Sequence, residues 1–167
     1  MSTVEEAIRM WEVFRDGTLA ELANIPEARW DYRPGEGARS LRELALHIAV
    51  SGIGFTAELL APETSFMRLR DPYVQAEMMA RYSTVESKQD IIDLLKTSMT
   101  EGAKSLREEA DMLSKKTMVM LNAEQSRITG IWFAAAHEMY HRGQLATYAR
   151  GMGLVPAMTQ RLQAPRK

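Results

Sequence analysis

The 167-residue sequence contains no cysteine, and this absence excludes several kinds of chemistry. Disulfide bonds, thiolate nucleophiles and sulfur-ligated metal sites all require a cysteine side chain. Any metal ion that the chain binds must therefore be held by nitrogen or oxygen ligands.

The sequence also lacks an excess of charge of either sign. Lys and Arg total 21 against 22 Asp and Glu, so the net charge is -1 and does not favour binding to nucleic acid or to an acidic membrane. Residues 1–6 are polar and acidic, unlike a secretory signal, and the apolar run 131–136 is far shorter than the roughly 20 residues that cross a bilayer. We expect a cytoplasmic protein, with residues 1–167 forming a single domain.

Four segments carry apolar residues at intervals of three and four, the spacing of one face of a helix. Serine followed three residues later by an acidic residue predicts where three of them begin, at Ser2, Ser40 and Ser87. The predicted helices run from Ser2 to before Pro26, from Leu41 to before Pro62, from about Ser87 to Lys115, and from Ser126 or Thr129 to Arg150.

The connections between these segments differ in length. Residues 25–39 are rich in proline and glycine and predict a loop, while 62–86 form a longer connection with a short helix from about Pro72 to Tyr82. Residues 117–121 resemble a strand, but one strand cannot form a sheet, so we expect a loop there and a basic tail after Pro156. The predicted fold is all-α, an antiparallel four-helix bundle with a longer connection between its second and third helices.

The sequence has three histidines, and their positions predict a metal site. His137 and His141 are four residues apart in the last helix, hence roughly 40° apart around its axis, and can bind one divalent ion together. His47 lies between Leu44 and Ser51 on the inner face of the second helix and is the candidate third ligand. The competing interpretation is that these are ordinary core histidines, which is the usual role of an isolated inward imidazole.

The segment His137-Glu138-Met139-Tyr140-His141 also matches the His-Glu-x-x-His pattern of zinc peptidases. Such enzymes commonly take a third ligand from downstream, yet residues 142–167 contain no Asp, Glu or His. A peptidase is therefore the least favoured interpretation. Glu138 points roughly 80° away from the middle of the histidine pair, toward a metal-bound water or a neighbouring helix, so no catalytic residue is assigned.

Gln144 is a candidate hydrogen-bond partner of a ligand.

Three stretches resemble the DinB/YfiT-like family of metal-binding helical bundles. They are Tyr32-Arg33-Pro34 with Ser40-Leu41-Arg42-Glu43-Leu44-Ala45-Leu46-His47, His137-Glu138-Met139-Tyr140-His141-Arg142-Gly143-Gln144-Leu145, and Tyr148-Ala149-Arg150-Gly151-Met152-Gly153-Leu154-Val155-Pro156. The resemblance implies that His47, His137 and His141 bind a divalent metal, zinc or nickel in most relatives. It also implies a homodimer. Residues 62–86 match the family least, so the resemblance does not indicate the substrate.

Two functions are consistent with these features. The first is a metal-dependent enzyme that transfers a group to, or hydrolyses, a small molecule, with a low-molecular-weight thiol as a candidate cosubstrate; relatives include thiol-dependent S-transferases and hydrolases. The second is a non-enzymatic protein that binds a small ligand or acts under stress, with a structural or vestigial metal site. No organic cofactor is expected in either case.

Overall fold

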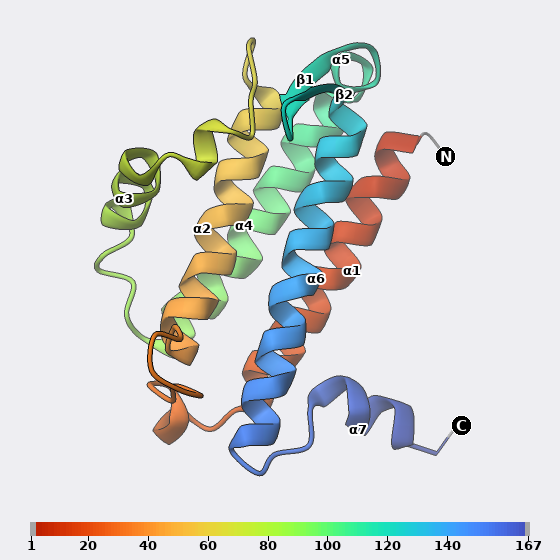
Figure 1. The fold of residues 1–167 in the computed structure, drawn as a ribbon. Coiled ribbons are helices and arrows are strands. Elements are labelled where there is room, and N and C mark those ends of the chain that lie inside the picture. Colours follow the sequence, from red (N-terminus) through yellow and green to blue (C-terminus); the bar gives the residue numbers. More distant parts are fainter. Residues whose placement is uncertain (1–2, 166–167) are drawn as a thin grey trace.

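The computed structural model describes residues 3–165, and most of these are helical. Four long helices in this part of the chain pack side by side as a bundle (Figure 1), which confirms the predicted helical fold. They are α1 (Thr3–Asn24), α2 (Leu41–Leu60), α4 (Lys88–Glu108) and α6 (Arg127–Gly151). The shorter elements are η1 (Glu27–Arg29), η2 (Arg68–Arg70), α3 (Pro72–Arg81), α5 (Ala110–Lys115), α7 (Ala157–Gln163), β1 (Thr117–Met120) and β2 (Ala123–Ser126).

The predicted helix starts are confirmed where the structure describes them. Ser40 caps α2 in a complete capping box with Glu43, and the Ser87 side chain accepts a hydrogen bond from the Asp90 amide at the start of α4. The cap predicted at Ser2 lies outside the described residues. The short helix predicted in the long connection is α3.

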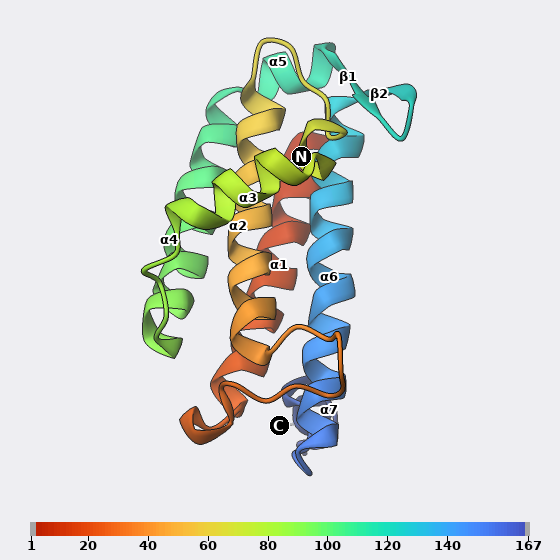
Figure 2. The ribbon, with the colours of Figure 1, turned by 60° about the vertical axis from the view of Figure 1, so that its left-hand side comes forward.

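The helix directions differ from the predicted antiparallel layout. Helix α6 packs against α1 and α2, and α4 packs against the same two helices. Figure 1 shows that α1 and α6 run in one direction and α2 and α4 in the other, so α1/α6 and α2/α4 are parallel neighbours. The prediction was wrong for these two pairs. The reason is the connection between α2 and α4, which returns along the bundle and places α3 across the outer side of α2 (Figure 2).

The core fills the space between the four long helices. Its largest buried side chains come from all of them and include Trp11, Leu44, Ile48, Leu95 and Ile131. Helix α2 is long and apolar enough, with a mean hydropathy of 1.3, to pass a membrane-span test based on length and composition alone. Core helices of soluble proteins often have the same length and hydropathy. Helix α2 packs against α4 and α6, as a core helix does. The absence of a membrane partner stays a prediction.

The segment expected to be a loop at 117–121 is half of a β-hairpin. Strand β1 pairs antiparallel with β2, and the turn residues Leu121 and Asn122 both have positive φ, at 52° and 61°. This is the backbone conformation of a tight two-residue hairpin turn. The prediction failed because β2 has the sequence Ala-Glu-Gln-Ser, which lacks the apolar alternation of a half-buried strand.

Two other predictions about the chain are also corrected. The third predicted helix breaks at Glu109, where the backbone leaves helical geometry, so α4 and α5 are separate. The tail after Pro156 forms α7, whose first amides, at Ala157 and Met158, donate hydrogen bonds to the buried carboxylate of Glu21. Helix α7 is therefore attached to α1 through the backbone at its start.

Arg127 joins the end of α2 to the start of α6. Its side chain is buried, and Nη1 donates to the carbonyl oxygens of Leu59 and Ala61 at 2.6 and 2.7 Å. Nη2 donates to Pro62 O at 3.0 Å. These carbonyls lie at the carboxyl end of α2, where helix oxygens have no partner within the helix and where a positive charge is favourable.

We predict that Arg127→Met lowers the free energy of unfolding by about 2–4 kcal/mol, because it leaves several buried carbonyl groups without a donor. Urea unfolding followed by circular dichroism measures the change. Arg161→Met, at an exposed position of α7, is the control and should change stability by less than about 0.5 kcal/mol. Equal stability of the two variants would contradict the role assigned to Arg127.

Candidate metal centre

The three histidines named from the sequence lie together in the structure. His47 comes from α2, and His137 and His141 come from successive turns of α6. His141 Nε2 lies 3.2 Å from His47 Nε2 and 3.1 Å from His137 Nε2, and one nitrogen from each ring falls within a group spanning 4.8 Å. The sequence therefore identified the residues that converge, although their role as metal ligands remains a prediction.

These distances suit coordination of a single metal ion. Nitrogens bound to zinc at 2.0–2.1 Å in a tetrahedral site lie about 3.3 Å apart, close to both separations seen here. Neutral imidazoles that direct their lone pairs at one point repel each other unless a proton or a cation lies between them. The donor set therefore fits a divalent ion that accepts three nitrogen ligands and keeps a position open.

Burial keeps the imidazoles in the protonation state that binds metal. Desolvation is the main cause that lowers the pKa of His47 to about 3 and that of His137 to about 4. The pKa of His141 is also lowered, mainly by desolvation, while its hydrogen bond to Gln144 acts in the opposite direction. At neutral pH all three rings are uncharged and their nitrogens are free to coordinate.

Two polar side chains lie at the Nδ1 atoms of two histidines, on the side of each ring opposite the converging Nε2 atoms. Gln144 Oε1 lies 2.7 Å from His141 Nδ1, so a proton on Nδ1 is donated to the amide oxygen and Nε2 carries the lone pair. Ser51 Oγ lies 3.4 Å from His47 Nδ1, at the long end of the hydrogen-bond range. The sequence-based prediction that Gln144 supports a ligand is thus consistent with its position beside His141.

Glu138 lies between the two α6 histidines in sequence but takes part in a different network. Its carboxylate is buried and accepts hydrogen bonds from Trp11 Nε1 at 2.8 Å and from Arg15 Nη2 at 3.0 Å, with Arg15 Nε also donating. Arg15 Nη1 further donates to Leu95 O on α4. Of the two alternatives left open for Glu138, the structure shows the neighbouring helix, so the glutamate of the peptidase pattern is not placed to activate water.

Gly52 makes room for this network. A Cβ atom at position 52 would lie 2.9 Å from Arg15 Nη2, so a larger residue on α2 would displace the guanidinium. Glycine is unfavourable within a helix by about 1 kcal/mol relative to alanine. The space beside Gly52 is therefore occupied by the Arg15 side chain.

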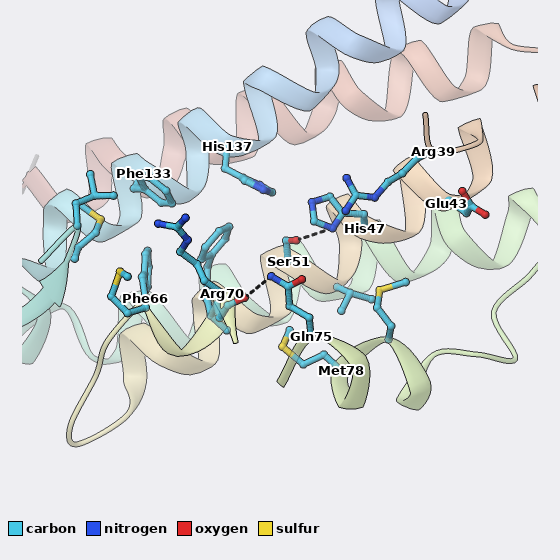
Figure 3. A pocket seen from close by; sticks show the side chains of 17 residues that line it. Arg39, Glu43, His47, Ser51, Phe66, Arg70, Gln75, Met78, Phe133 and His137 are labelled. Carbon is cyan, nitrogen blue, oxygen red and sulfur yellow. Dashed lines mark hydrogen bonds between the residues drawn. The ribbon is translucent and has the colours of Figure 1, made fainter. Parts of the chain in front are cut away.

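A cavity of about 490 Å³ lies beside the histidines and includes His47 and His137 in its lining. Figure 3 shows these two side chains directed toward one another, with Gln75 and Met78 of α3 on the opposite wall. Most of the wall is apolar. Its hydrophobic residues are Val50, Phe55, Phe66, Met67, Leu69, Met78, Met79, Met120, Leu121 and Phe133. The volume is typical of a small-molecule site.

Sequence reasoning missed one feature of this region. Arg15 was not recognised as a buried partner, although it lies four residues after Trp11 and three before Thr18, within the apolar stripe of α1. A charged residue in such a stripe indicates a buried counter-charge. Gln75, Met78 and Met79 of α3, in the long connection at 62–86, complete the cavity wall.

We predict that the metal-free protein becomes less stable as the pH falls from about 7 to about 5. The unfolded chain takes up protons on its histidines near pH 6.5, whereas His47 and His137 in the folded protein do so only near pH 3 and 4. The stabilisation is present above pH 6.5 and is lost as the pH decreases toward 4. Urea unfolding at the two pH values measures it, and a His47→Gln/His137→Gln variant should show a flatter dependence. An equally steep dependence in that variant would disprove the explanation.

We further predict that Glu138→Gln lowers the free energy of unfolding by about 2–4 kcal/mol, because the buried Arg15 loses its counter-charge. Its metal content should remain that of the wild type, since the side chain faces α1. Glu77→Gln, which removes an exposed ion pair with Arg81, is the matched control and should cost less than about 1 kcal/mol. Loss of metal without loss of stability in Glu138→Gln would place the carboxylate at the metal instead.

Comparison with known proteins places these observations in a family. No curated protein matches the sequence. YjoA, a DinB-like protein of Bacillus subtilis, is 19% identical with a TM-score of 0.66, over 89% of this chain and 92% of its own. A protein of Exiguobacterium sibiricum assigned to the DinB family is 24% identical with a TM-score of 0.64, over 92% of this chain and 94% of its own.

A third similar structure is YfiT from Bacillus subtilis, described as a probable metal-dependent hydrolase with an unusual four-helix bundle topology. It is 17% identical with a TM-score of 0.66, over 90% of this chain and 88% of its own. Identities this low show a shared fold. The family model described as DinB family matches residues 1–166, and so confirms the resemblance found in the sequence motifs. The chain therefore belongs to the DinB family.

Proposed function

We propose that this protein is a metal-dependent enzyme that acts on a small molecule, with a divalent ion, zinc or nickel, held by His47, His137 and His141. The observation that carries the proposal is the convergence of three neutral imidazole nitrogens, with His47 and His137 lining a cavity large enough for a substrate. A bound ion with three histidine ligands and an open position supplies Lewis acidity, which lowers the pKa of a coordinated water or thiol.

The residues around the site favour a nucleophile that loses its proton without help from a general base. Glu43 is the carboxylate among the described lining residues, and it accepts hydrogen bonds from Arg33 and from the Ser40 amide. Glu138 is bound to Arg15 and Trp11. No uncommitted carboxylate in the described chain therefore lines the cavity as a general base. A thiol, with a pKa near 8.5, needs a base less than water does, so we favour transfer to a low-molecular-weight thiol over hydrolysis.

Residues at the cavity wall and beside it position the metal ligands and shield the reactants. His141 is held by Gln144, which maintains the direction of its Nε2 atom. Phe55 contacts the His137 ring edge-on, with ring centres 5.0 Å apart, and keeps bulk water from that side of the imidazole. YfiT, of the same fold, is described as a hydrolase, so hydrolysis is the second candidate reaction. The cytoplasmic location and the homodimer stay predictions from the sequence.

We predict that protein purified without chelator contains about one equivalent of zinc or nickel, because three nitrogen ligands complete a stable site. Elemental analysis of the purified protein measures the metal. His141→Ala should lose most of it, whereas Tyr140→Ala, a neighbouring exposed position on α6, should retain it. Metal-free wild type, or full metal content in His141→Ala, would refute the proposed site.

Activity is tested on the same preparations with an aromatic electrophile and a panel of cellular thiols, alongside ester and amide substrates. We expect thiol conjugation that requires metal and falls by at least about tenfold in His141→Ala. Hydrolysis without conjugation would identify the second candidate reaction. Metal-loaded protein that turns over neither panel would instead support the non-enzymatic ligand-binding function.

A further inference from the structure

The cavity beside the histidines combines an apolar wall with two cationic side chains. Arg39 and Arg70 line it, and within residues 3–165 neither guanidinium has a hydrogen bond or an ion pair. The other charged side chain in the described lining is Glu43, which is paired with Arg33 and also accepts a hydrogen bond from the Ser40 amide. The cavity therefore has a net positive charge before any metal is bound.

Arg39 is the arginine that faces the metal centre. Figure 3 shows its side chain directed toward His47. Desolvation is the main cause of the lowered pKa of His47, His137 and His141, and the positive charge of Arg39 is a smaller cause in each case. Its backbone is fixed on both sides: Tyr148 Oη donates to the Arg39 carbonyl oxygen at 3.0 Å, and Ser40 begins α2 with a full capping box. The backbone of Arg39 is thus held in place, while its side chain is free to meet a ligand.

Arg39 is exposed at the cavity, and its positive charge beside three uncharged imidazoles raises the electrostatic potential there, which attracts an anion. No carboxylate of the described chain pairs with Arg39, and a ligand with an acidic group would supply the opposite charge. The nearby aromatic and methionine side chains, such as Phe55, Phe66 and Met78, favour an apolar body on the same molecule. Gly54 lets α3 approach closely here, because a Cβ atom at that position would lie 2.5 Å from Met78 Cε.

We propose that the cavity binds an amphipathic organic anion, with the acidic group paired to Arg39 and the apolar body among the phenylalanine and methionine side chains. This inference rests on the proposed function, since it names the substrate class of the same site. It predicts that electrophiles or hydrolysable substrates carrying a carboxylate are preferred over uncharged analogues of the same shape. Binding in the metal-free protein tests it separately, because the arginines are present with or without the ion.

The experiment titrates metal-free protein with phenylbutyrate and with phenylbutanol, which has the same apolar body without the charge. Methionine methyl NMR signals report the location, because Met78 and Met79 line the cavity whereas Met10 lies on the outer surface of α1. We expect both probes to shift the Met78 and Met79 signals but not that of Met10. Phenylbutyrate should bind about fivefold more tightly, the size expected of a partly solvated ion pair.

Two variants identify the source of the preference. Arg39→Gln should reduce phenylbutyrate binding to the level of phenylbutanol and leave phenylbutanol binding unchanged, which shows that the cavity is intact. Arg81→Gln, an exposed α3 arginine outside the cavity lining, should keep the wild-type preference. Equal affinity for the two probes, a preference that survives in Arg39→Gln, or no shift at Met78 and Met79 would overturn the inference. If protein purified without chelator contains no metal, and the expected preference for phenylbutyrate is still observed, the metal site is refuted and the anion site stands.

Discussion

The buried ion pair between Glu138 and Arg15 fixes how α6 is rotated within the bundle. Successive residues on a helix differ by about 100°, so a residue held against α1 determines which neighbours face α2. With Glu138 bound to Arg15 and Trp11, His137 and His141 are directed toward His47 on α2. Arg15 also donates to Leu95 O, so α4 is part of the same network. The glutamate of the His-Glu-x-x-His pattern therefore contributes to the metal centre by positioning a helix.

The candidate metal centre has no negative charge among its ligands. Its three candidate ligands are neutral, the nearest carboxylate on α6 is committed to Arg15, and Arg39 adds a positive charge at the cavity. A divalent ion bound there would keep most of its charge, which strengthens its effect on the acidity of a coordinated nucleophile. The same excess of positive charge suits an anionic reactant. The proposed metal chemistry and the proposed ligand preference thus have one electrostatic origin.

The sequence predicted the elements whose signals are local. Helix spacing and the caps at Ser40 and Ser87 located the helices, and three histidines in two inward faces were enough to foresee their convergence. The parallel pairing of α2 with α4 depends on the path of a long connection, which no local pattern encodes. The spacing of Arg15 within an apolar stripe indicates a buried counter-charge, but its partner Glu138 and the position of Arg39 at the cavity depend on segments distant in the sequence.

The central claim is that His47, His137 and His141 bind one metal ion through Nε2. The most direct measurement is an anomalous difference map, recorded at the metal absorption edge from crystals of protein purified without chelator. We predict a single strong peak about 2.0–2.2 Å from all three Nε2 atoms. A map with no peak between these nitrogens, from crystals in which the same side chains are well ordered, would contradict the account.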